Sequence, residues 1–157
     1  MIWNEWFKKW HLESLKITTP FAEAVWQPLE ADSDAAWELY IELLTRITTQ
    51  RLAPEDGDEK TALDSIYSLF PLTRSIIKHY GRDCLEFTKL AIIVLNQVIR
   101  PFTAKWHRIA NEGGFENEAI CLEFREDLAN LQIFIQGYTQ ALADMAGVED
   151  LTQLEGN

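Results

Sequence analysis

The sequence contains none of the short motifs that mark common catalytic metal or nucleotide sites. Its 157 residues include no HExxH, no ExxH pair, no glycine-rich phosphate loop and no CxxC, and these patterns carry the ligands and donors that such chemistry needs. We therefore predict neither a metal site nor a cofactor. The two cysteines, Cys84 and Cys121, lie within apolar patterns where a free thiol acts as a small hydrophobe, and this predicts a reducing compartment such as the cytoplasm.

Long apolar runs are also missing. The densest stretch, residues 90–99, is interrupted by two polar residues and is much shorter than the roughly 20 residues that a membrane span requires. At the start of the chain, Asn4, Glu5 and Lys8 stand where a secretory signal would need an unbroken apolar core. We expect a soluble, cytoplasmic protein with no transmembrane segment.

Alternation of apolar and polar residues with period two, which marks half-buried strands, is absent over any convincing length. The β-branched clusters at 17–19 and 47–49 are too short for strands or lie in helical patterns. A chain of this length fits one domain, and its sequence contains no internal repeat or linker. The sequence therefore predicts a single all-α domain over residues 1–157.

Apolar residues at steps of three and four predict four main helices. The first covers residues 34–52, with Asp32, Ser33 or Asp34 as its capping residue and Pro54 beyond its end.

The second and third helices each contain a proline. In the second, residues 63–80, Pro71 removes one backbone donor and crowds the preceding turn, so we expect a kink or a break near Ser68. In the third, residues 83–110, Pro101 predicts either a kink or the start of a new helix.

The fourth helix, residues 117–145, carries a continuous apolar stripe and is followed by Gly147, a common stop signal. Because long helices with short connections pack as antiparallel neighbours, we predict an up-and-down bundle of four main helices with its core in residues 34–146. An N-terminal aromatic helix at 1–16 precedes the bundle, and the tail at 150–157 is expected to be frayed.

The predicted N-terminal helix has a strongly aromatic face. Trp3, Trp6, Phe7 and Trp10 fall within one arc of a helical wheel, and we take them as candidate binding residues. Three interpretations stay open: the face packs on the bundle as a fifth helix, it docks on a partner or a second copy, or it anchors at a membrane interface. The acidic remainder of the chain disfavours contact with a membrane surface.

Charge is segregated along the chain. The net charge is −11, yet residues 71–110 hold seven Lys or Arg against Asp83 and Glu86. The segment 96–108 interleaves cations with apolar side chains, and its candidate binding residues are Arg100, Phe102, Lys105, Trp106, His107 and Arg108. Such a surface suits an acidic protein partner or a second copy. Because the rest of the chain is acidic and repels nucleic acid, any nucleic acid is expected to bind only through this segment. Cations near helix ends also complement exposed carbonyls, which is the purely structural interpretation.

Two arginine–histidine pairs share their spacing with a known family. Four residues separate Arg74 from His79, and six separate Arg100 from His107. Both intervals resemble the Arg-x(4–6)-His pattern of the HEPN ribonucleases, which are small helical bundles. The resemblance implies a dimeric endoribonuclease in which the histidine acts as acid or base and the arginine stabilises the phosphorane. The residue after each arginine, a serine or a proline, departs from the Asn, Asp or His usual in that family.

We predict a non-enzymatic protein–protein interaction module that is an oligomer or an accessory subunit of a larger assembly. The HEPN-like endoribonuclease is the alternative, with Arg100 and His107 preferred over Arg74 and His79. An unbroken helix over residues 83–110 would be about 40 Å long, so the two histidines are not expected to share one site.

Overall fold

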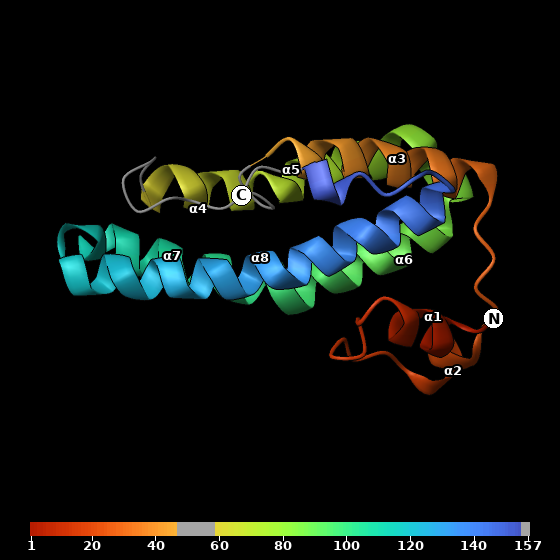
Figure 1. Cartoon of the computed structure of the whole chain (residues 1–157), viewed down its shortest axis with the longest axis horizontal. Helices are drawn as coiled ribbons and strands as arrows, with labels where there is room; N and C mark the ends of the chain where they lie inside the picture. The colour runs from red at the N-terminus through yellow and green to blue at the C-terminus, as the bar shows by residue number, and fades with distance from the viewer. Residues whose placement is uncertain (47–58, 155–157) are drawn as a thin grey trace.

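The computed structural model of the chain describes residues 1–46 and 59–154, and within them it confirms an all-α fold (Figure 1). In these residues the extended pairing is limited to one isolated bridge between Ile2 and Val25. The helices are α1 (Trp3–Lys9), α2 (Thr19–Glu23), α3 (Glu30–Leu44), α4 (Glu59–Tyr67), α5 (Leu69–Tyr80), α6 (Leu85–Val94), α7 (Arg100–Asn111) and α8 (Glu118–Ala146), with short helical segments η1 (Gly81–Cys84), η2 (Leu95–Ile99), η3 (Gly114–Glu116) and η4 (Thr152–Leu154).

The larger helices lie along one long axis. Figure 1 shows α6 and α7 following one another along this axis, with α8 returning beside them. Helix α3 contacts α5, α6 and α8, and α4 contacts α7 and α8. Helices α1 and α2 form a small N-terminal unit, which an extended segment joins to α3. Among the described residues, no helix is both long and apolar enough to cross a membrane.

The structure places α8 where its local signals predict it. Asn117 precedes the helix, and its side-chain Oδ1 accepts hydrogen bonds from the N–H groups of Ala119 and Ile120 at 2.9 and 3.3 Å. At the other end, Gly147 has φ +69°, a left-handed conformation that residues with a side chain adopt at a cost. Both ends are therefore fixed by residues next to them in the sequence.

The two proline-containing segments are each divided. Helices α4 and α5 are separated at Ser68, and Pro71 lies in the first turn of α5, where a missing N–H removes no helical hydrogen bond. The segment η2 is π-helical and lies between α6 and α7. Pro101 is the second residue of α7, so its missing donor also falls in a first turn.

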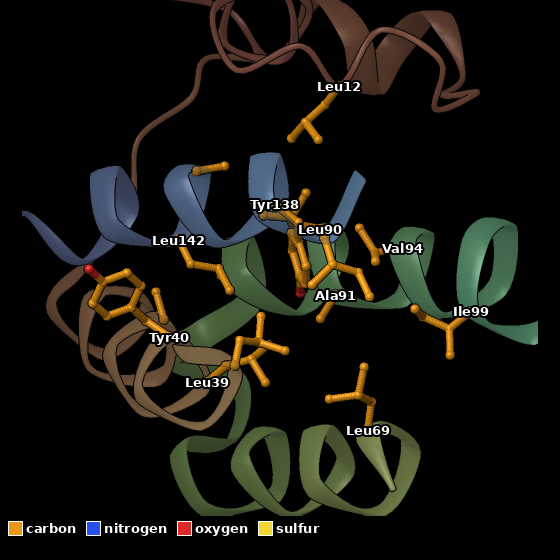
Figure 2. Close-up of a cluster of buried hydrophobic side chains, with 14 of the residues drawn as sticks. Leu12, Leu39, Tyr40, Leu69, Leu90, Ala91, Val94, Ile99, Tyr138 and Leu142 are labelled. Carbon is orange, nitrogen blue, oxygen red and sulfur yellow. The ribbon is translucent and has the colours of Figure 1, made fainter. Parts of the chain in front are cut away.

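The hydrophobic core joins all the larger helices of the bundle (Figure 2). It is built from side chains that recur at helical spacing on the inner faces of α3, α5, α6 and α8. The labelled members are Leu39 and Tyr40 from α3, Leu69 from α5, Leu90, Ala91 and Val94 from α6, Ile99 from η2, and Tyr138 and Leu142 from α8, with Leu12 entering from the N-terminal unit.

The N-terminal aromatic face is part of this core. The side chains of Trp3 and Trp6 are 0% exposed and Phe7 is 1% exposed, while Trp10 is partly buried. The prediction of an aromatic docking surface was therefore wrong for Trp3, Trp6 and Phe7, and the packing interpretation is the one that the structure adopts. Removal of this much aromatic surface from water drives the packing.

The N-terminal helix is shorter than predicted. Helix α1 ends at Lys9, and the chain turns at His11, whose φ of +59° lies in the left-handed region. Leu12 and Leu15 then enter the core from the following loop. The sequence predicted a helix over residues 1–16 because apolar residues continue past Lys9, but the later ones are buried from a loop and not from a helix.

The first bundle helix begins earlier than predicted, at Glu30 rather than residue 34. Asp32 is the reason, because its Oδ2 accepts the Leu29 N–H at 2.8 Å inside the first turn. Its Oδ1 accepts the N–H of Phe87 at 2.9 Å and thereby joins α3 to α6. The predicted end near Leu52 and Pro54 lies outside the described residues.

Two residues of the C-terminal tail, Leu151 and Thr152, pack on the bundle. The N–H of Leu151 donates to the hydroxyl of Tyr40, and Thr152, 3% exposed, donates through its N–H and hydroxyl to the carboxylate of Asp150 at 3.0 Å each. Asp150, Gln153 and Leu154 are exposed, so fraying of the tail stays a prediction, and residues 155–157 lie outside the described part of the chain.

Candidate functional site

A cleft of about 210 Å³ lies between the α4–α5 junction and α7. Its α7 side is formed by residues 100, 103, 104 and 107, a spacing that places four side chains on one helical face. The opposite side comes from the end of α4 and the first half of α5. The lining residues are Tyr67, Phe70, Arg74, Arg100, Thr103, Ala104 and His107.

Arg100 is held in a defined position at the cleft. Its Nε and Nη2 donate to the Oδ1 of Asn96 at 3.3 and 3.2 Å, one helical turn earlier. Its guanidinium lies 4.9 Å from the ring centroid of Phe70, across the cleft. A guanidinium has five N–H donors, so several remain available to a ligand.

Arg74 and Arg100 approach the cleft from facing helices without a carboxylate partner. Among the described residues, neither arginine forms an ion pair, although Lys60, Lys105 and Arg125 each lie within 4 Å of a carboxylate. Other described cations, such as Lys16, Lys78 and Arg108, also have no ion pair within the described part of the chain, but Arg74 and Arg100 line the same cleft. The cleft therefore attracts an anionic group.

His107 packs against Tyr67 and lies near Asp64. Its ring makes an edge contact with Tyr67, with centroids 4.9 Å apart, and its Nε2 lies 3.9 Å from Oδ1 of Asp64. That separation is too long for a hydrogen bond, and the nearer partner of Asp64 is Lys60 at 3.0 Å. The His107 side chain is 29% exposed, so it can exchange a proton or a hydrogen bond with a bound ligand.

These residues can bind a carboxylate or a phosphate. An arginine fork matches either group with two parallel hydrogen bonds, and the exposed ring of Tyr67 offers an apolar surface beside it. His107 could also act as an acid or base toward a bound group. Among residues 1–46 and 59–154, no cluster of three His, Cys, Asp or Glu side chains could hold a metal ion.

The structure brings together three of the four residues of the arginine–histidine pairs. Arg74, Arg100 and His107 all line the cleft. His79 does not line it; its ring packs edge-on against Tyr80 at the end of α5, with centroids 4.7 Å apart. The cleft therefore groups Arg74 with Arg100 and His107, and it does not bring His79 to Arg74.

Much of the predicted binding segment points into the protein instead. Trp106 is 0% exposed and its Nε1 donates to Asp127 at 3.1 Å, while Phe102 packs against the buried ring of Phe124. These two were wrongly predicted to lie at a binding surface, because the helical period places them on the inner face of α7.

Lys105 is engaged within the protein as well. Its Nζ lies 2.8 Å from Asp127 and 3.5 Å from Glu123, and the hydrogen bond to Asp127 raises the pKa of the lysine above its ordinary value. Arg108 is exposed but does not line the cleft. Sequence reasoning missed Tyr67 and Phe70, because nothing local indicates that the α4–α5 junction faces α7.

Comparison of the chain with protein families, with curated proteins and with solved structures found no match. Any proposal about the function of this protein therefore rests on the geometry of the cleft.

Proposed function

We propose that the protein is a non-enzymatic interaction module whose cleft binds an acidic group of a partner protein. The observation that carries the proposal is the pair of arginines, Arg74 and Arg100, which face one cleft from different helices and have no ion pair with the described residues. The role as an oligomer or an accessory subunit in the cytoplasm belongs to the same proposal.

A protein carboxylate suits this cleft better than a nucleic acid does. The positive charge is local, and the net charge of −11 repels the parts of a long nucleic acid that extend beyond the cleft, a repulsion that a short acidic peptide largely avoids. A single carboxylate presented by a protein avoids most of this repulsion, since exposed charges are screened beyond about 8 Å at physiological salt. The exposed ring of Tyr67 also suits an apolar neighbour of such a carboxylate.

Titration with hexaglutamate tests the proposal through the Nε–H signals of the arginines in a proton–nitrogen correlation spectrum. We expect the Arg74 and Arg100 signals to shift with saturation, and the double substitution Arg74→Ala, Arg100→Ala to abolish binding. Lys78→Ala is the matched control, because Lys78 is on α5 but outside the cleft lining. Unmoved arginine signals at saturating peptide would reject the proposal.

The HEPN-like endoribonuclease is the second candidate. It is favoured by one observation, that Arg100 and His107 line the same cleft. Incubation with a single-stranded RNA oligonucleotide tests it: cleavage that disappears in His107→Ala and persists in His79→Ala supports the ribonuclease. Absence of cleavage by the unaltered protein removes this candidate and leaves the interaction module in place.

A further inference from the structure

The outer face of α8 exposes a row of apolar side chains. Leu122 and Ile133 are 65% and 70% exposed, and their separation of three helical turns directs both side chains the same way. Ala129, also exposed, lies between them on that face. Scattered exposed apolar residues are ordinary, but a row on one helical face is typical of a contact surface.

Two acidic residues flank Leu122 on the same face. Glu118 and Glu126 lie four residues before and after it, so the three side chains stand one above another. Both glutamates are exposed, and neither has a cation within ion-pair distance among the described residues. We refer to Glu118, Leu122, Glu126, Ala129 and Ile133 as the α8 outer face.

The cleft has the opposite arrangement, with two unpaired arginines beside the ring of Tyr67, which is 51% exposed. We propose that the cleft of one copy receives the α8 outer face of a second copy. Leu122 then lies against the ring of Tyr67, and Glu118 and Glu126 pair with Arg74 and Arg100. This deepens the proposed function, on which it rests, by naming the partner that supplies the acidic group.

The α8 outer face cannot reach the cleft of its own chain. Helix α8 is continuous over 29 residues, and its inner face is buried through residues such as Leu128 and Ile135. Its outer face therefore points away from its own bundle and cannot turn into its own cleft. A helix lying in a groove is a common recognition mode, and local charge complementarity is required here because two chains of charge −11 otherwise repel.

Charge reversal on either surface tests this pairing. Sedimentation equilibrium of the unaltered protein over a range of concentrations should show self-association. Arg100→Glu and Glu126→Arg should each raise the dissociation constant by about tenfold or more, because each places like charges together.

Mixing the two variants gives the decisive result. In the mixture, the intact cleft of one variant meets the intact α8 outer face of the other, and the two altered surfaces again carry opposite charges. We therefore expect two poorly associating proteins to associate when mixed. Lys78→Glu and Glu13→Arg change the charge equally at exposed positions outside both surfaces and should associate as the unaltered protein does.

Three outcomes would overturn the inference: an unaltered protein that stays monomeric at every concentration, reversal variants that associate normally, or a mixture that does not recover. The hexaglutamate titration separates this failure from failure of the proposed function. Leu122→Asp should prevent self-association and leave the arginine signals responsive to the peptide. A monomer that binds hexaglutamate would indicate a different acidic partner, and one that binds RNA instead would indicate nucleic acid.

Discussion

At the scale of single residues, tryptophans and carboxylates form the recurring polar contact of this protein. The indole N–H of Trp3 donates to Glu86 at 2.8 Å, and those of Trp6 and Trp10 donate to Asp144 at 2.8 and 3.1 Å. A buried indole donor needs such an acceptor. Each of these carboxylates also lies near a lysine, as does Asp127, which accepts from Trp106. Some of the carboxylates behind the negative net charge therefore act as hydrogen-bond acceptors for tryptophans.

Asp144→Ala should destabilise the protein, because it leaves the donors of Trp6 and Trp10 without an acceptor. We expect a loss of about 2 to 4 kcal/mol in the free energy of unfolding, measured by urea denaturation. Asp144→Asn keeps one acceptor oxygen and should lose less. Equal losses in the two variants would show that the charge, rather than the hydrogen bonds, matters.

Tyr80 predicts a pH dependence in the alkaline range. The hydrogen bond from its hydroxyl to Glu38, 2.7 Å long, raises its pKa to about 12, above the value of 10.0 for an unperturbed tyrosine. Since the folded pKa is the higher one, the stabilisation is fully present below pH 10 and is lost as the pH rises through 12. Stability measured between pH 9 and pH 12 should therefore fall more steeply in the unaltered protein than in Tyr80→Phe. Parallel curves would contradict this prediction.

At the scale of helices, the sequence predicts where a helix begins or ends only if residues next to that end cap it. Both ends of α8 follow from Asn117 and Gly147, which cap the helix locally. The end of α1 was not predictable, because the turn after Lys9 depends on how the aromatic residues pack. The same holds for the cleft: its arginines stand out in the sequence, but the rings opposite them are brought there by tertiary packing.

Two glycines provide a matched test of helix and turn packing. A Cβ at Gly114 would lie 2.3 Å from the Ile109 Cγ2 and 2.8 Å from its carbonyl oxygen, so Gly114→Ala should destabilise the protein by about 1 to 3 kcal/mol. At Gly137 the nearest atom, the Trp10 carbonyl oxygen, is 3.5 Å away, so Gly137→Ala in α8 should stabilise it by up to about 1 kcal/mol. Thermal unfolding followed by circular dichroism measures both, and the opposite order would reject this packing.

At the scale of the whole molecule, the N-terminal unit completes the bundle. Trp3, Trp6, Phe7 and Leu12 belong to the same buried cluster as α6 and α8. The unit is also fastened by two hydrogen bonds between the backbone of Lys16 and the side chain of Gln97, at 2.8 and 2.6 Å. Because large buried side chains make most of this contact, we expect residues 1–16 to fold and unfold together with the bundle.

Deletion of residues 1–16 should therefore abolish or greatly weaken cooperative unfolding, because it exposes the apolar surface that α1 covers. Circular dichroism melting curves and binding of a hydrophobic dye would report this loss. Trp37→Ala, at a tryptophan that is 43% exposed, is the control and should shift the midpoint little. A truncated chain that melts like the full one would show that the unit is an independent appendage.

The π-helical segment η2 immediately precedes the face of α7 that lines the cleft. A π turn holds about one residue more than an α turn, so the loss of a single residue within Leu95–Ile99 can be absorbed by a return to α geometry. Helix α7 would then keep Trp106 in the core and Arg100 and His107 at the cleft. A deletion of the same size inside α7 cannot be absorbed in this way, because it rotates the residues after it by about 100° about the helix axis. The chain should therefore tolerate a one-residue deletion in η2 far better than one a few positions later.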